Sequence, residues 1–296
     1  MLSYFQAIVI GLIQGVTELF PISSLGHSVL IPAWLGWHEI VGAQSEGESF
    51  YLAFVVALHV ATALALLWYF RADWVRIMRG FVRSLHTRKL ETPDERMAWL
   101  LIVATIPAGI TGLALEHALR TLFAKSLAAA IFLTINGLIL LAGESVRRRA
   151  SVRALVAEYP TSESDAEVGR RLDTLDFKEA GVVGVAQIGA LFAGISRSGI
   201  TMVAGLVRGL DHEDAARFSF LLATPIILAA GVYKLPDLTG PLGNGIRGQV
   251  LAGGVAAALA AYAAVRFLMR FFETRNLMPF AIYCLVAGGL SIIRFA

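Results

Sequence analysis

The sequence reads QGVTELFPISSLGH from Gln14 to His27 and repeats this outline as QIGALFAGISRSGI from Gln187 to Ile200. Aligned without gaps, the two motifs share Gln, Ile, Ser and Gly at the same places. Each follows an apolar segment too short or too interrupted for an ordinary membrane span, and each gathers polar groups that a lipid-embedded chain avoids. The repetition predicts a duplicated membrane protein whose working site is built from both copies.

The composition is that of an integral membrane protein. Hydrophobic residues make up 57% of 296 residues and charged residues 16%, whereas soluble domains carry about 25% charged residues. The single Cys284 lies in an apolar run, so neither a disulfide framework nor a cysteine metal cluster is expected. Glycine patterns for nucleotide binding are missing from the sequence, and no nucleic-acid partner is expected.

Six apolar segments approach the roughly 20 residues that a membrane-spanning helix needs. They are Phe50–Phe70, Met97–Leu115, Leu127–Leu141, Phe218–Val232, Val250–Val265 and Leu277–Ile293. Two further segments, Leu2–Phe20 and Val182–Phe192, run into the polar part of a motif. Because irregular backbone at membrane depth must be covered by protein or line a cavity, both are interpreted as re-entrant helical hairpins.

The predicted fold is therefore an all-α membrane protein with six transmembrane helices and two re-entrant hairpins. A hairpin and three spans form a first repeat over residues 1–145, a charged linker covers 146–178, and a second repeat covers 179–296. Three spans are an odd number, so the second repeat is inverted relative to the first. Inverted repeats with broken helices that meet near the midplane are a known membrane-protein arrangement.

The placement of Lys and Arg predicts the orientation. In this topology seventeen of the 25 basic residues fall on one face and five on the other, with Arg197, Arg208 and Arg217 left out because they belong to the second hairpin and its exit. Basic loops face the cytoplasm. Both termini and the mouth of the first hairpin then face the opposite side of the membrane.

The first motif carries groups suited to acid–base chemistry. Glu18 follows Gln14 by one helical turn, so the two side chains share a face, and Ser23, Ser24 and His27 come next. Ser24 or Ser23 is a candidate nucleophile, with His27 or Glu18 as its base. Alternatively, Glu18 holds a divalent cation that neutralises phosphate charge.

The second motif carries groups suited to binding phosphate. Arg197 can hold phosphate oxygens through two parallel hydrogen bonds, and Ser196, Ser198 and Thr201 add hydroxyls around it. If the two motifs meet, one pocket combines a carboxylate, an imidazole, hydroxyls and a guanidinium. That combination suits a phosphorylated substrate.

Other polar residues have simpler interpretations. His59 is a solitary imidazole in an apolar span and is expected to be a hydrogen-bonded packing residue, as are Asn136 and Thr134 across helices. Asp211 is expected to cap the helix that follows it. The basic stretch Arg71–Lys89 is either an orientation signal only or an amphipathic surface helix that binds anionic lipid.

At these motifs the sequence resembles the undecaprenyl-pyrophosphate phosphatases of the BacA/UppP family. The resemblance rests on Glu18–His27 and Gly194–Thr201, with support from Phe218–Pro225 and Pro279–Tyr283, and it extends over both halves in order. It implies hydrolysis of undecaprenyl pyrophosphate to undecaprenyl phosphate, which recycles the lipid carrier for peptidoglycan synthesis and confers bacitracin resistance. It also implies an outward-opening active site and a divalent cation, Mg²⁺ or Ca²⁺.

The resemblance also implies roles for individual residues. Ser24 matches the nucleophile, His27 the histidine that assists it, Glu18 the acidic residue of the first motif and Ser23 a supporting hydroxyl. The phosphate-binding residues of the second motif match Ser196, Arg197 and Thr201, and Ser198 lies among them. The family's first motif opens with Glu in many members, and the neutral Gln14 weakens the expected metal site.

A second class of function stays open from the sequence. Inverted repeats with discontinuous helices also suit a transporter or flippase for a polyprenyl phosphate or another anionic lipid. Two adjacent serines, a histidine and an arginine exceed what anion binding needs, which favours the phosphatase. The expected partners are the lipid substrate and the bilayer, with a homodimer left open.

Overall fold

The computed structural model describes residues 2–37, 40, 50–123, 125–157, 171–240 and 245–296. Over these ranges the chain forms eleven α-helices and two short 3-10 helices, and no strand. The all-α prediction is confirmed.

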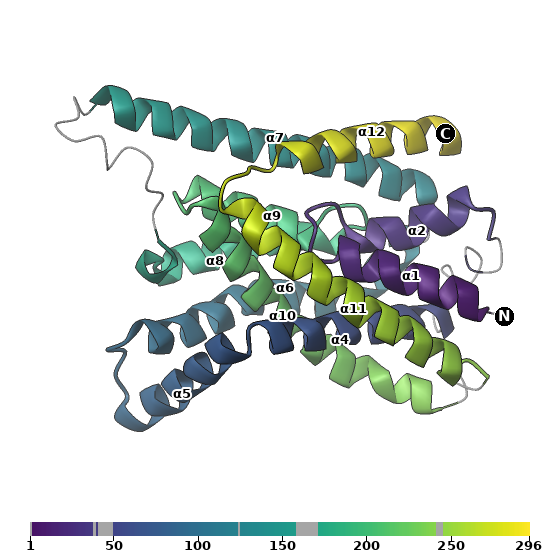
Figure 1. Ribbon diagram of the computed structural model, residues 1–296, viewed down its shortest axis with the longest axis horizontal. Coiled ribbons are helices and arrows are strands. Elements are labelled where there is room, and N and C mark those ends of the chain that lie inside the picture. The colour runs from purple at the N-terminus through teal and green to yellow at the C-terminus, as the bar shows by residue number, and fades with distance from the viewer. Residues whose placement is uncertain (1, 38–39, 41–49, 124, 158–170, 241–244) are drawn as a thin grey trace.

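The first half of the chain contains six of the α-helices (Figure 1). They are α1 (Tyr4–Thr17), α2 (Ser24–Trp34), α4 (Phe50–Tyr69), α5 (Arg71–Thr87), α6 (Pro93–Phe123) and α7 (Ser126–Ala157). The second half contains η1 (Leu172–Thr174), α8 (Phe177–Ala186), η2 (Gln187–Leu191), α9 (Arg197–Val207), α10 (His212–Thr239), α11 (Arg247–Phe272) and α12 (Met278–Phe295).

Six of these helices are long and apolar enough to cross a membrane: α4, α6, α7, α10, α11 and α12. α4 matches its predicted segment to within one residue. The other helices extend past their apolar parts, because helix hydrogen bonds also form between polar residues. α7 continues to Ala157, into the predicted linker, and Asp211 caps α10 by accepting from the Asp214 amide.

The two short helix pairs lie between the long helices. In Figure 1, α7 and α12 run side by side along one side of the molecule, and α4 and α10 lie toward the other. α1 packs along α11, while α8 packs along α6. Each motif is thereby carried by a short helix that a long helix supports.

The contact between α1 and α11 depends on small residues. A Cβ added at Gly11 would lie 2.2 Å from the Gly253 carbonyl oxygen, and one added at Gly15 would lie 2.3 Å from that of Ala257. Such close backbone approach is typical of helix packing in membranes. At its start α1 is fixed by a capping box between Ser3 and Gln6. These contacts hold the first motif at the end of a rigid helix.

Candidate active site

The first motif folds into the end of α1, a turn and the start of α2. α1 ends at Thr17, Pro21 lies in the turn, and α2 begins at Ser24. Ser23 caps α2 by accepting a hydrogen bond from the Gly26 amide at 3.2 Å. The φ angle of Ser23 is 71°, which non-glycine residues rarely adopt. Such a conformation persists only where surrounding contacts enforce it.

The second motif repeats this plan. η2 ends at Leu191, the turn contains Gly194 with φ of 113°, and α9 begins at Arg197. Ser196 caps α9 by accepting from the Gly199 amide at 3.1 Å. Both motifs therefore place a serine at a helix N-cap and a functional candidate at the first helical position.

The two turns contact each other directly. The Gly194 amide donates to the Ser23 hydroxyl at 3.1 Å, and the Ser198 hydroxyl donates to the Phe20 carbonyl at 3.2 Å. A Cβ on Gly26 would lie 2.9 Å from the Gly194 Cα. The motifs meet, as their repetition predicts.

Asn136 of α7 joins both turns from a fully buried position. Its Nδ2 donates to the Pro21 carbonyl at 2.9 Å, and its Oδ1 accepts from the Ser196 amide at 2.9 Å. The expected interhelical role of Asn136 is confirmed. The same expectation for Thr134 is wrong, because its hydroxyl donates to the Ala130 carbonyl of its own helix at 3.0 Å.

The buried carboxylate of Glu18 lies at the centre of the site. The Ser24 hydroxyl donates to its Oε2 at 2.5 Å, and Gln14 Nε2 donates to the same oxygen at 3.0 Å. Arg197 forms an ion pair with Oε1. His59 Nε2 lies 3.2 Å from Oε2. Residues from α1, α2, α4 and α9 thus converge on one carboxylate.

His59 belongs to this site, and sequence analysis missed it. Its Nδ1 donates to the Val55 carbonyl at 2.8 Å, which turns Nε2 toward Glu18. The available signal was a polar side chain inside an apolar span. That signal does not say which neighbour the side chain meets, because the neighbour, Glu18, lies on another helix.

His27 is positioned differently from the prediction that it assists Ser24. Its Nδ1 lies 2.7 Å from the Ser23 carbonyl oxygen, and its Nε2 lies 2.7 Å from the hydroxyl of Tyr283 on α12. The two rings also stack, with centroids 5.7 Å apart. The structure therefore brings Ser24 to Glu18 and brings His27 to Tyr283.

The hydroxyls of the second motif are used within the protein. The Ser196 and Ser198 hydroxyls lie 3.0 Å apart, and Thr201 Oγ1 donates to the Arg197 carbonyl at 2.7 Å. Ser219 of α10, which was not predicted, lies 2.7 Å from Thr201 Oγ1. These groups shape the turn, while the Arg197 side chain is the part of the second motif that reaches Glu18.

The starts of α2 and α9 favour an anion at this place. Helix N-termini present unpaired amides and a partial positive charge. Over the described ranges, no group accepts from the amides of Ser24 and Leu25, or from those of Arg197 and Ser198. A cation at the start of a helix is unfavourable, so the Arg197 guanidinium depends on Glu18 or another anion for compensation.

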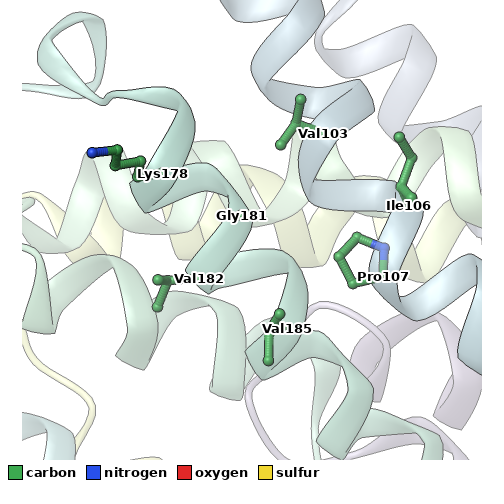
Figure 2. Close-up of a pocket in the computed structure, with 7 residues that line it drawn as sticks. All are labelled: Val103, Ile106, Pro107, Lys178, Gly181, Val182 and Val185. Atoms are coloured by element: carbon green, nitrogen blue, oxygen red, sulfur yellow. The ribbon is translucent and has the colours of Figure 1, made fainter.

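A groove of about 490 Å³ lies between α6 and α8, away from these residues (Figure 2). Its lining consists of Val103, Ile106, Pro107, Lys178, Gly181, Val182 and Val185. Lys178 is its only charged lining residue, and none of the seven belongs to either motif. The cluster around Glu18 is thus the better candidate for phosphate chemistry.

Comparison with known proteins shows the family of the chain. The model of the family described as bacitracin resistance protein BacA matches residues 7–290. Undecaprenyl-diphosphatase 2 of Frankia alni is 57% identical, and undecaprenyl-diphosphatase of Mycolicibacterium paratuberculosis is 58% identical, each over 100% of this chain and 98% of the relative. Undecaprenyl-diphosphatase 2 of Burkholderia ambifaria is 46% identical over 97% and 95%. The chain belongs to the BacA family of multi-pass membrane proteins.

Proposed function

We propose that the chain hydrolyses undecaprenyl diphosphate to undecaprenyl phosphate and phosphate, which recycles the lipid carrier for peptidoglycan synthesis and confers bacitracin resistance. The observation that carries this proposal is the 2.5 Å hydrogen bond from Ser24 to Glu18, beside the Arg197 guanidinium. A nucleophile, a base and an anion-binding cation are the parts that phosphoryl transfer requires. The names of the relatives identify the lipid diphosphate.

Binding of the diphosphate begins at Arg197. The guanidinium pairs with Glu18, and phosphate oxygens offer it a bidentate partner. The amides at the starts of α2 and α9 face the same anion. Transfer of Arg197 from Glu18 to the substrate leaves the carboxylate free to accept a proton.

The reaction then proceeds through Ser24. As its Oγ attacks the terminal phosphorus, Glu18 Oε2 accepts the hydroxyl proton, and the bond from that phosphorus to the bridging oxygen breaks. Undecaprenyl phosphate leaves. The proton on Glu18 passes to the departing undecaprenyl phosphate. A water molecule, deprotonated by Glu18, next attacks the phosphoserine, and the bond from phosphorus to Ser24 Oγ breaks. Glu18 returns the proton to that oxygen as inorganic phosphate is released.

His59 and His27 complete the arrangement of the site. His59 fixes one oxygen of Glu18 from α4, and therefore orients the base rather than contacting the phosphate. His27 stays attached to Tyr283 and the Ser23 carbonyl. It holds the N-cap residue that places Ser24 at the start of α2.

A divalent cation beside Glu18 is part of the proposal. Gln14 Oε1 is buried and has no hydrogen-bond partner among the described residues, and Glu18 Oε2 lies one helical turn away. Mg²⁺ takes oxygen ligands and is commonly held by one or two carboxylates together with substrate phosphates. Glu18 and Gln14 would hold Mg²⁺ or Ca²⁺ in this way, and the cation would neutralise charge on the diphosphate.

The membrane arrangement belongs to the same proposal. α1 with α2, and α8 with α9, are interpreted as re-entrant hairpins of an inverted repeat over residues 1–145 and 179–296, joined through 146–178. The pairing of α1 with α11 and of α8 with α6 supports this symmetry. The basic loops support an orientation in which the site faces the periplasmic side of the plasma membrane. A homodimer stays a prediction, checked by the mass of the purified protein.

The deciding experiment measures phosphate release from undecaprenyl diphosphate by the purified protein, with and without a chelator. Wild type is compared with Ser24→Ala and Gln14→Glu. Release that depends on Ser24 and on the cation supports the proposal. Movement of an anionic lipid across vesicles without phosphate release would replace the phosphatase with a flippase, and indifference to the chelator would remove the cation.

A further inference from the structure

α5 carries an apolar stripe that is exposed on the protein. The stripe consists of Val75, Met78, Val82 and Leu85, whose side chains are 47%, 51%, 59% and 53% exposed. Their spacing of three and four residues places them on one face of the helix. Scattered apolar side chains need no explanation, but a continuous stripe over three turns does.

The opposite face of α5 is fixed to the protein. Ile77, Gly80 and Ser84 are buried, and a Cβ at Gly80 would lie 2.8 Å from the backbone of Asp94 at the start of α6. The Ser84 hydroxyl accepts from Trp99 Nε1 at 2.9 Å. Because this side packs so closely, the stripe points away from the protein in a fixed direction.

α5 begins where a candidate membrane span ends. α4 is a 20-residue span, which crosses about 30 Å at 1.5 Å per residue. It ends at Tyr69, Phe70 leaves the helical conformation, and α5 begins at once at Arg71. In Figure 1, α5 projects from the bundle beside the start of α6. Trp68, exposed and under the Arg71 guanidinium, is a residue type enriched at membrane interfaces.

The basic residues of this region fall into two groups. Carboxylates pair with Arg76 and Arg83 on the side toward α6, and Glu91 lies 3.5 Å from Lys89. Arg79 and Arg88 have no carboxylate partner among the described residues. Arg79 follows Val75 by four residues and precedes Val82 by three, so it borders the stripe.

We infer that this α5 surface, made of the stripe with Arg79 and Arg88, binds anionic phospholipid of the adjoining leaflet. The stripe enters the boundary between headgroups and acyl chains, and the two guanidinium groups bind lipid phosphates. An apolar face bordered by unpaired cations is complementary to an anionic leaflet. This binding goes beyond the proposed phosphatase activity, because the lipid is bulk phospholipid and the surface lies apart from Glu18.

The charge contribution is tested by titrating purified full-length protein with phosphatidylglycerol and counting bound lipids by native mass spectrometry. One basic residue near an anionic membrane strengthens binding roughly fivefold, so Arg79→Gln with Arg88→Gln should weaken it about 25-fold. The matched control is Arg270→Gln with Arg275→Gln at the end of α11. An equal loss in both double variants, or no loss in the first, would overturn the assignment of the two arginines.

The position of the stripe is tested in vesicles that contain phosphatidylglycerol. An environment-sensitive fluorophore is attached at Met78→Cys, or at Glu91→Cys as the control on the polar side; Cys284 is buried and stays in place. Spin-labelled lipid should quench the Met78 probe and aqueous iodide should not, with the reverse at Glu91. Iodide quenching of both probes would show that the stripe faces water or awaits a protein partner, and the inference would fail.

Discussion

The turn that carries Glu18 and the turn that carries Arg197 share a backbone plan but differ in chemistry. Each follows a buried glutamine, Gln14 or Gln187, and each ends at a serine that caps the next helix. At aligned places, however, Leu191 stands for Glu18 and Arg197 stands for Ser24. The two turns have the same backbone scaffold, whereas Glu18, Ser24 and Arg197 each occur in only one of them.

Electrostatics explains why opposite charges in the two turns are favourable. Two carboxylates in one dry site repel each other, as do two guanidinium groups. A carboxylate from one turn and a guanidinium from the other form an ion pair that holds both turns together. The comparison therefore predicts that equivalent changes in the two motifs have different consequences.

Removal of the reactive pair in the first motif should have the largest effect. Ser24→Ala and Glu18→Gln are each expected to lower kcat about 1000-fold or more, because one removes the proposed nucleophile and the other its proposed base. Initial rates of phosphate release measure this. Ser28→Ala is the control, since that hydroxyl donates to the Leu25 carbonyl one turn further along α2. A Ser24→Ala enzyme within about tenfold of wild type would make water the direct nucleophile.

Substitution of Arg197, the positively charged residue of the second motif, should reduce activity somewhat less. Arg197→Lys keeps the charge but loses the bidentate geometry, so kcat/KM should fall about 100-fold. Arg208→Lys at the end of the same helix is the matched control. If Arg197→Lys keeps the wild-type kcat/KM, as Arg208→Lys should, then positive charge alone is sufficient in the second motif and the guanidinium geometry is irrelevant.

Much of this comparison could be read from the sequence. The repeated motifs, the six apolar segments and the shared face of Gln14 and Glu18 all follow from local spacing, and local spacing survives folding. The predicted contact between the motifs rested on the cost of polar groups in a membrane. The Asp211 cap followed from the preference of aspartate for helix N-termini.

The partners of His27 and His59 could not be predicted from the sequence, because they depend on contacts between residues far apart in the chain. Nothing local separates His27 from Glu18 as partner of Ser24, because both lie within a few residues of it. The structure distinguishes them through Tyr283 on the last helix, whose hydroxyl lies 2.7 Å from His27 Nε2. In the same way, the sequence alone predicts that His59 is a packing residue. Its contact with Glu18 exists only because the fold brings α4 beside the end of α1.

The paired glutamines allow one substitution to be made in both copies. Gln14→Glu places a second carboxylate beside Glu18, and should lower the Mg²⁺ concentration for half-maximal activity about tenfold. Gln187→Glu instead buries a carboxyl near the Ala104 carbonyl, to which Gln187 Nε2 donates at 3.4 Å. It should cost about 2 kcal/mol of stability and leave the Mg²⁺ dependence unchanged. Magnesium titrations and thermal unfolding of both variants measure these effects, and identical behaviour would show that the copies are not specialised at this position.

The smallest expected loss of activity concerns Tyr283, which contacts His27 of the first motif. Ile200 stands in the place of His27, so the second motif has no counterpart of the bond to Tyr283. Tyr283→Phe removes that bond and keeps the ring stacking, which should lower kcat about fivefold, as expected for one neutral hydrogen bond. KM should stay unchanged, because Arg197 and the helix amides still bind the diphosphate. Tyr262→Phe on α11 is the control. A rise in KM instead of a fall in kcat would place His27 on the substrate, and both motifs would then share in holding the phosphate.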